Sequence, residues 1–280
     1  MHPAYDLYCA KNPGPVCIAV PHGGRDYPAD ITPVLAMPLA RARGIEDRYV
    51  DVLADEAIAR GHCTLVARTP RLLIDLNRAE TDIDPATVEG CMVHGARPTY
   101  RARGGLGLIP DRLPGAGPLW RRRVDMATLA DRIAKVHRPY HAALAKCIGS
   151  AQRVHGHAIM IDLHSMPPLT GHNAADVVIG DLNGITAAPE IVDAAQALFE
   201  SNGLRVARNI PYAGGYVLER HARPLAQVHA IQIEIDRRLY LDSRLDTPGP
   251  GVARLADIIA DLADMLTTLR PESALAIAAE

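Results

Sequence analysis

The sequence predicts an α/β protein with a mixed, largely parallel central sheet that helices cover on both faces. Short apolar runs with the length of buried strands recur along the chain, and segments with the periodicity of amphipathic helices lie between several of them. The expected strands are residues 16–20, 63–67, 72–76, 158–163, 176–179, 205–207 and 230–235. Such alternation of strand and helix is typical of sheets whose strands run mostly parallel.

Two segments carry the clearest helical pattern. Apolar residues at positions 50, 53, 54, 57 and 58 form one helix face, and those at 252, 255, 259, 262, 266 and 269 form another. Residues 80–123 differ, because they are rich in Pro, Gly and Arg and show little periodicity. Since long irregular segments inside domains tend to be functional, we expect a single domain over 1–280 with an insertion at about 80–123.

Composition excludes several classes of protein. A chain of 280 residues with 48% hydrophobic side chains can bury a large core. Its 30 basic and 32 acidic residues give a formal net charge of −2, which argues against a nucleic-acid or membrane-binding surface. We find no leader-like or membrane-spanning segment and expect a cytoplasmic protein. The five cysteines lack CxxC or paired spacing, so we expect neither a disulfide framework nor a zinc ribbon.

Two of the expected strands end in a histidine. His22 follows residues 16–20 on a Pro-His-Gly-Gly bend, and His164 follows residues 158–163 shortly before two prolines. Ligands gather beyond the carboxyl ends of strands in open α/β sheets. Two neutral imidazoles there can share a zinc ion with one carboxylate and a water molecule. The alternative is that both histidines only bond to backbone carbonyls.

The stretch GIEDRYVDVLADEA offers the carboxylate. We expect Asp47 at the start of a helix, with Asp51 one turn later on the same face. Either can bind the metal while the other caps the helix or orients a histidine. We favour Asp47 as the ligand.

Polar residues also surround the apolar run LLIDL. The planar fork of Arg78 suits bidentate binding of a carboxylate, and Asn77 can add a neutral donor to the same group. Arg71, at the start of the run, is a candidate donor to an oxyanion or to the substrate. The alternative for Arg78 is a structural salt bridge with Asp75 or Glu80.

The stretch HAIQIEIDRRLY has one apolar and one polar face. Isoleucines at 231, 233 and 235 alternate with Gln232, Glu234 and Asp236. If helices cover both faces of the sheet, Glu234 is a confined carboxylate, and confinement raises a carboxyl pKa and makes a better proton acceptor near neutral pH. The alternative is the exposed face of an edge strand.

Together these residues resemble the N-formylglutamate amidohydrolase (N-formylglutamate deformylase) family. The matching stretches, in family order, are VPHGGRDYP, EDRYVDVLADEA, PRLLIDLNR, HRPYHAAL, IDLHSMP, PYAGGYVLERHARP and HAIQIEIDRRLY. That family is related to the zinc carboxypeptidases and aspartoacylases, so the resemblance implies a zinc-carboxypeptidase-like fold with one zinc ion per chain. It implies metal ligands at His22 and His164, substrate-carboxylate binding by Asn77 and Arg78, and a general base at Glu234. The carboxypeptidases take their acidic ligand three residues after the first histidine, where this chain has Arg25, and we expect Asp47 in its place.

The activity so implied is hydrolysis of N-formyl-L-glutamate, or a close N-acyl amino acid, in histidine degradation. We expect Glu234 to take a proton from the attacking water, and zinc with Arg71 to stabilise the oxyanion. The alternatives are a related metal-dependent deacylase or carboxypeptidase of other specificity, and a catalytically silent metal- or ligand-binding homologue. Candidates for the second carboxylate of glutamate are Arg97, Arg101, Arg103, Arg220 and Arg223.

Overall fold

The computed structural model describes residues 3–90, 95–113 and 115–271, so Cys91 and parts of the expected insertion fall outside the described residues. Contacts divide the chain into two compact units. The first unit holds Pro21–Asp47 and Ala67–Ala142 together with the start of the chain. The second unit holds Leu7–Val20, Arg48–Val66 and the residues from Ala143 onward.

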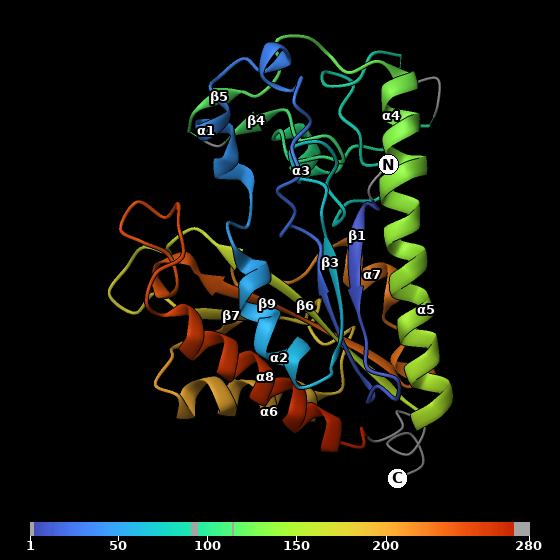
Figure 1. The fold of residues 1–280 in the computed structure, drawn as a ribbon, viewed down its shortest axis with the longest axis vertical. Helices are drawn as coiled ribbons and strands as arrows, with labels where there is room; N and C mark the ends of the chain where they lie inside the picture. The colour runs from blue at the N-terminus through green and yellow to red at the C-terminus, as the bar shows by residue number, and fades with distance from the viewer. Residues whose placement is uncertain (1–2, 91–94, 114, 272–280) are drawn as a thin grey trace. The chain divides into compact units, whose positions relative to one another are not determined.

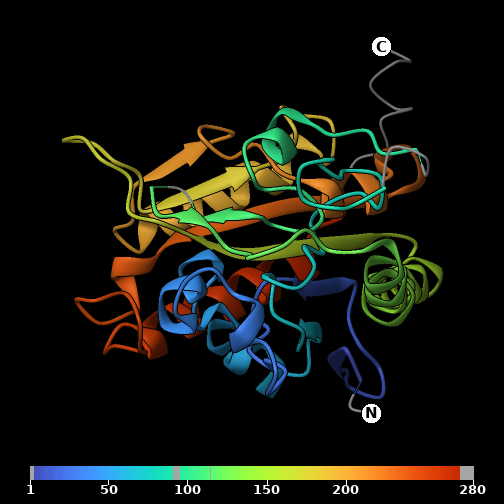
Figure 2. The same ribbon diagram turned by 90° about the horizontal axis from the view of Figure 1, so that it is seen from above.

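A seven-stranded mixed sheet runs in the order β1-β3-β2-β6-β9-β7-β8, with β6 and β9 as long neighbouring strands in both views (Figures 1 and 2). Its strands are β1 (Tyr5–Tyr8), β2 (Val16–Val20), β3 (Cys63–Ala67), β6 (Ala158–Met166), β7 (Val177–Gly180), β8 (Val206–Arg208) and β9 (Val228–Asp236). The neighbours β3, β2, β6 and β9 run parallel, whereas β7 pairs antiparallel with β9. The predicted mixed, largely parallel sheet is therefore confirmed.

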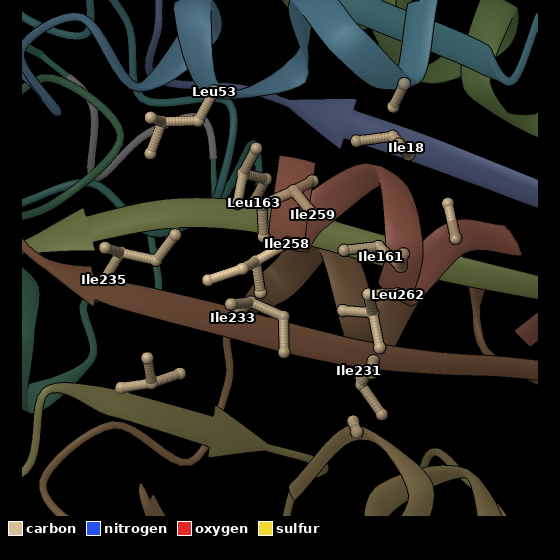
Figure 3. Packing of buried hydrophobic residues seen from close by; sticks show 14 of the residues in the cluster. Ile18, Leu53, Ile161, Leu163, Ile231, Ile233, Ile235, Ile258, Ile259 and Leu262 are labelled. Atoms are coloured by element: carbon tan, nitrogen blue, oxygen red, sulfur yellow. The ribbon is translucent and has the colours of Figure 1, made fainter. Parts of the chain in front are cut away.

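One face of this sheet carries the main core of the second unit. Isoleucines and valines at alternate strand positions, such as Ile18, Ile161 and Ile233, pack together there (Figure 3). The covering helices are α2 (Asp55–Ala59), α6 (Pro189–Ser201) and α8 (Val252–Thr268). Each fully buried side chain of this kind contributes about 1.5–3 kcal/mol. Among the described residues no helix, α8 included, is both long and apolar enough to cross a membrane.

The other face of the same strands is polar. It carries Asp162 and His164 on β6 and Gln232 and Glu234 on β9, all buried. Helix α7 (Tyr216–His221) contacts β9. A strand buried on both sides keeps charged groups only where they have partners or a function, so this face is where the second unit can carry chemistry.

The first unit is built from short elements. They are α1 (Leu39–Ala42), α3 (Tyr100–Arg103), the hairpin of β4 (Arg112–Leu113) and β5 (Gly117–Pro118), α4 (Met126–Arg132), the π-helical segment Ile133–His137 and the start of α5 (Arg138–His155). The segment between residues 80 and 123, which lacks periodicity, contains only α3, β4 and β5 among its described residues.

The prediction of a strand at residues 72–76 is wrong. The Leu73 amide bonds to the carbonyl of Pro70 in a turn, and the Asp75 side chain accepts the backbone N–H of Asn77 at 2.8 Å. Leu72 and Ile74 pack into two different apolar clusters of the first unit. The run is apolar because its side chains enter two separate cores.

The cysteines correct another expectation. Cys9, just after β1, forms a disulfide with Cys63 at the start of β3. Cys17 and Cys147 keep free thiols, and burial, with a smaller contribution from nearby Cys147, raises the pKa of Cys17 to about 12. All four line one cavity of about 190 Å³ in the second unit. Spacing rules missed the disulfide because neighbouring strands bring together cysteines 54 residues apart.

Candidate functional site

The bend after β2 is shaped by a close approach of two backbones. A Cβ atom at Gly24 would lie 2.2 Å from the carbonyl oxygen of Thr69, so only glycine fits there. The amide of Asp26 donates to the carbonyl of Arg68 at 3.0 Å on the same side. The glycine thus lets the chain pass against residues 68–69 directly after His22, which is 2% exposed.

His22 lies between two carboxylates of the first unit. Its Nε2 atom donates to Oδ1 of Asp75 at 2.7 Å, and its Nδ1 atom lies 3.4 Å from Oδ2 of Asp47. Both aspartates are buried. A carboxylate that accepts one ring N–H fixes the histidine tautomer and leaves the other ring nitrogen with its lone pair, as in metal-ligating histidines.

Asp75 is the centre of this polar cluster. Its carboxylate also accepts Arg71 Nε at 2.8 Å and the backbone N–H of Asn77 at 2.8 Å. Burial alone would raise the pKa of Asp75, but the charges of Arg71, His22 and Arg78 and the hydrogen bond from His22 hold that pKa well below its usual range. Asp75 is therefore a buried anion that orients its neighbours.

Arg78 is only loosely paired within the first unit. Its Nε atom lies 3.9 Å from Asp75 Oδ2 and 4.0 Å from Asp82 Oδ2, which is beyond hydrogen-bond distance, and has no hydrogen-bond partner among the described residues. Burial lowers its pKa and the charge of Asp75 opposes this effect, but a guanidinium stays charged in proteins. Glu80, the other carboxylate considered for Arg78, pairs with Arg138 instead.

The expected helix through Asp47 and Asp51 is not formed. Tyr49 has a φ of 54°, in the left-handed region, and a 3₁₀ segment begins only at Val50. Asp51 lies in the first turn of that segment and Asp47 lies before it. Because the left-handed residue breaks the helical register, the two aspartates do not share a helix face.

His164 and Glu234 are neighbours on the polar face of the second unit. They lie directly opposite each other in the parallel register of β6 and β9. The Nε2 atom of His164 lies 3.0 Å from Oδ2 of Asp162, and Gln232 Nε2 donates to Oε1 of Glu234 at 2.9 Å. Glu234 is 8% exposed, so it lies on a covered face rather than on the exposed edge considered as an alternative.

Each of the two histidines lies near a buried aspartate, through a hydrogen bond at His22 and through a 3.0 Å approach without hydrogen-bond geometry at His164. His22 is backed by Asp75 and His164 by Asp162, and both aspartates are fully buried. A buried carboxylate near the Nε2 atom of a buried histidine is typical of histidines that bind a metal through the other ring nitrogen. Histidines that served only to bond backbone carbonyls would not need these carboxylates.

The glycine-rich loop before α7 approaches the polar face. A Cβ atom at Gly180, which pairs with Gln232, would lie 2.6 Å from the backbone carbon of Ala213. On α7, Arg220 donates to the hydroxyl of Tyr216 at 2.6 Å. This loop therefore lies against the β7 backbone beside the strand that carries Glu234.

Sequence reasoning gave no role in the site to three side chains of these clusters: Asp75, considered only as a salt-bridge partner of Arg78, Gln232, noted only as part of a polar face, and Asp162. Each is a polar residue inside an apolar run, and each bonds to or pairs with a residue that was singled out. The signal was available, since an acid or amide within a buried apolar segment has to be satisfied by a partner.

The fold and these side chains are those of a class of mixed α/β hydrolases with buried histidines, carboxylates and arginines. The sequence profile of the N-formylglutamate amidohydrolase family matches residues 14–241. The crystal structure of N-formylglutamate amidohydrolase from Ralstonia eutropha is similar, with a TM-score of 0.87 and 33% identity over 94% of this chain and 96% of that chain. The chain therefore belongs to the N-formylglutamate amidohydrolase family.

The names of two further relatives agree with this placement. A protein named N-formylglutamate deformylase from Pseudomonas aeruginosa is 28% identical over 82% of this chain and 83% of its own length. Its namesake from Pseudomonas putida is 25% identical over 81% of this chain and 82% of its own length. A gene product of Agrobacterium tumefaciens, 18% identical with a TM-score of 0.66, has the same fold.

Proposed function

We propose that this protein hydrolyses the amide bond of N-formyl-L-glutamate to formate and glutamate. The family and the names of the Pseudomonas relatives support this substrate. The single observation that carries the chemistry is the pair of buried histidines, His22 and His164, each backed by a buried aspartate. Such a pair suits a hydrolytic metal centre better than a surface for macromolecules.

We further propose that His22, Asp47 and His164 hold one zinc ion. All three are buried and have ligand types that zinc favours. The strands β2 and β6 are parallel neighbours, with Ala19 opposite Asp162, so chain continuity carries both histidines toward the same sheet edge. A zinc ion there would supply Lewis acidity to the formyl oxygen and lower the pKa of water toward about 7.

Other residues of the chain bind the substrate and move the proton. Arg78 and Asn77 bind a carboxylate of glutamate, since the buried Arg78 guanidinium is only loosely paired with Asp75 and Asp82. Glu234 takes a proton from the attacking water and passes it to the departing nitrogen, with Gln232 fixing one of its oxygens. Arg71, oriented by Asp75, donates to the oxygen that develops negative charge.

A release assay tests the activity. Purified enzyme is incubated with N-formyl and N-acetyl derivatives of glutamate, aspartate, glutamine and leucine, with metal added or stripped, and free amine is measured. N-formyl-L-glutamate is expected to be the best substrate, and a chelator is expected to abolish turnover. Preference for an acetyl group would indicate a deacylase of other specificity. Binding without turnover of any compound would indicate a silent homologue.

Elemental analysis tests the ligands. About one zinc per chain is expected in the wild type, and His22→Ala or His164→Ala should lose most of it. The matched control is His172→Ala, since His172 is an exposed histidine whose ring bonds only to Asn173 among the contacts found. Equal zinc content in all four proteins would remove these histidines from the site.

A substitution at Arg78 tests carboxylate recognition. Arg78→Lys keeps the charge but loses the planar fork, so kcat/KM on N-formyl-L-glutamate should fall about tenfold or more. The control is Arg205→Lys, because Arg205 binds Asp176 through two nitrogens on the surface of the second unit. Wild-type kinetics in Arg78→Lys would mean that Arg78 is structural.

A further inference from the structure

Two buried histidines of the first unit take no part in the reaction described above. His137 is the last residue of the π-helical segment, and His141 follows one turn later in α5. Both are fully buried, and their ring centroids are 4.5 Å apart. A π-helical turn is a rare form that occurs frequently at functional sites.

Both histidines bond to the segment that carries the substrate-binding pair. His137 Nε2 donates to the backbone carbonyl of Arg78 at 2.8 Å, and His141 Nε2 donates to that of Leu76 at 3.0 Å. A carbonyl only accepts, so both rings carry a proton on Nε2. The two hydrogen bonds therefore hold the peptide group before Asn77 and the peptide group after Arg78.

The same helix start holds the chain just beyond Arg78. Arg138 donates from Nε and Nη2 to the carboxylate of Glu80 at 3.0 Å and 2.8 Å. The Nδ1 atom of His137 lies 3.6 Å from Glu80 Oε1. Three side chains from two consecutive helical turns thus hold residues 76, 78 and 80.

Residues 72–78 depend on such side-chain hydrogen bonds to hold their backbone. Residues 72–78 form neither helix nor strand, so no regular backbone ladder holds them. The backbone N–H of Asn77 bonds to the Asp75 side chain. The backbone carbonyls of Leu76 and Arg78 still need donors from elsewhere in the protein. A carbonyl that lost its donor could rotate, and the side chain attached to the same peptide would move with it.

We infer that His137 and His141 are positioning residues that hold the backbone at Leu76 and Arg78, so that the side chains of Asn77 and Arg78 meet a carboxylate of the substrate. This inference rests on the proposed function, in which those two side chains bind the glutamyl group. The histidines touch no substrate. They set its affinity through the backbone.

The test separates positioning from general stability. His137→Leu and His141→Leu remove the donors, while His137→Gln and His141→Gln keep an N–H that can reach the same carbonyl. The matched control is His155→Leu, because His155 lies in the same helix and its Nε2 bonds to the carbonyl of Pro13 at 2.9 Å. Values of kcat and KM are measured for N-formyl-L-glutamate and for N-methylformamide, a formamide without carboxylates.

Each leucine variant is expected to raise KM for N-formyl-L-glutamate about tenfold with less than a threefold change in kcat. Turnover of N-methylformamide should stay unchanged. The glutamine variants should recover most of the wild-type KM, and the His155 variant should keep it. Where circular dichroism shows that a leucine variant is unfolded, methionine replaces it, since methionine also lacks a donor and is more adaptable in a core.

Two results would overturn the inference while the proposed function stands. One is an unchanged KM in the folded donor-free variants, and the other is an equal loss of activity on the neutral formamide, which would indicate a structural role. A wild-type enzyme that does not release glutamate from N-formyl-L-glutamate overturns the proposed function itself, and the inference with it.

Discussion

Replacing Asp75 by asparagine is expected to destabilise the protein strongly. The substitution keeps the shape of the side chain but removes its charge and turns one acceptor oxygen into a donor. Whichever way the amide faces, it cannot accept from His22, Arg71 and the Asn77 amide together, as the carboxylate does. A donor then faces a donor inside a fully buried cluster.

The size of the effect follows from burial. Breaking a buried charged pair by removing one partner costs about 3–5 kcal/mol, and a buried charged hydrogen bond contributes about 1.5–3 kcal/mol. We therefore expect Asp75→Asn to lower the free energy of unfolding by about 3–5 kcal/mol, which corresponds to a Tm lower by roughly 10 °C in a chain of this size. Zinc affinity should fall about 10–100-fold, because Asp75 orients His22.

The chain offers a matched control on its surface. Asp264 also pairs with one histidine and one arginine, His62 Nε2 at 2.8 Å and Arg60 Nη1 at 2.8 Å, but its side chain is 52% exposed. Exposed pairs contribute about 0–1 kcal/mol, so Asp264→Asn should change Tm by a few degrees at most. Thermal unfolding by calorimetry and zinc competition with a chelator are measured for both. Equal losses of Tm would refute the argument from burial.

Three further predictions concern the second unit. Gly180→Ala should lower activity and Tm, because its Cβ atom would lie 2.6 Å from the Ala213 backbone. The control is Gly149→Ala inside α5, whose Cβ atom would meet nothing closer than 3.6 Å and which should stabilise the protein by up to about 1 kcal/mol. Thermal unfolding compares the two variants. Burial, with the charges of two neighbouring arginines, lowers the pKa of His221 to about 3. As the pH falls, His221 therefore takes up a proton in the unfolded chain at a higher pH than in the folded chain. The contribution of His221 to the free energy of unfolding should then be present above about pH 6.5 and fall by about 2 kcal/mol on going to pH 5. In denaturant titrations His221→Asn should remove this loss. Glu234→Gln should lower kcat by about 10²–10⁴ with zinc content and calorimetric substrate affinity unchanged, and loss of zinc there would instead make Glu234 a ligand.

The central strands were predictable because each carries apolar side chains on at least one face of the sheet, either in a continuous run or at alternate positions. The runs at 16–20, 158–163 and 230–235 became β2, β6 and β9 with nearly those bounds. The run at 72–76 has the same composition and is no strand, because Pro70 starts a turn and Asp75 bonds to the backbone beyond it. Composition alone does not distinguish a buried strand from an irregular segment whose apolar side chains enter two different cores.

The candidate site was predictable where chemistry follows a strand end, and less so where it depends on tertiary pairing. His22, His164 and Glu234 were recognised as polar groups interrupting or ending apolar runs. Asp75 was considered only as a partner for Arg78, although its nearest contacts are His22 and Arg71. Those partners lie in loops whose paths depend on long-range packing, and no local period encodes them.

The bond between Cys9 and Cys63 has a consequence for anyone preparing this protein. Closing a loop of 54 residues restricts the unfolded chain by about 4 kcal/mol in the chain-entropy description. A thiol reductant would remove this restraint and, being itself a zinc ligand, would also compete for the zinc ion proposed above. A loss of activity in such a buffer could then come either from the opened disulfide or from the loss of zinc, and the activity alone would not distinguish them. A phosphine reductant opens the disulfide while binding zinc far less, so preparations treated with a phosphine, a thiol or neither separate the contribution of the cross-link from that of the ion.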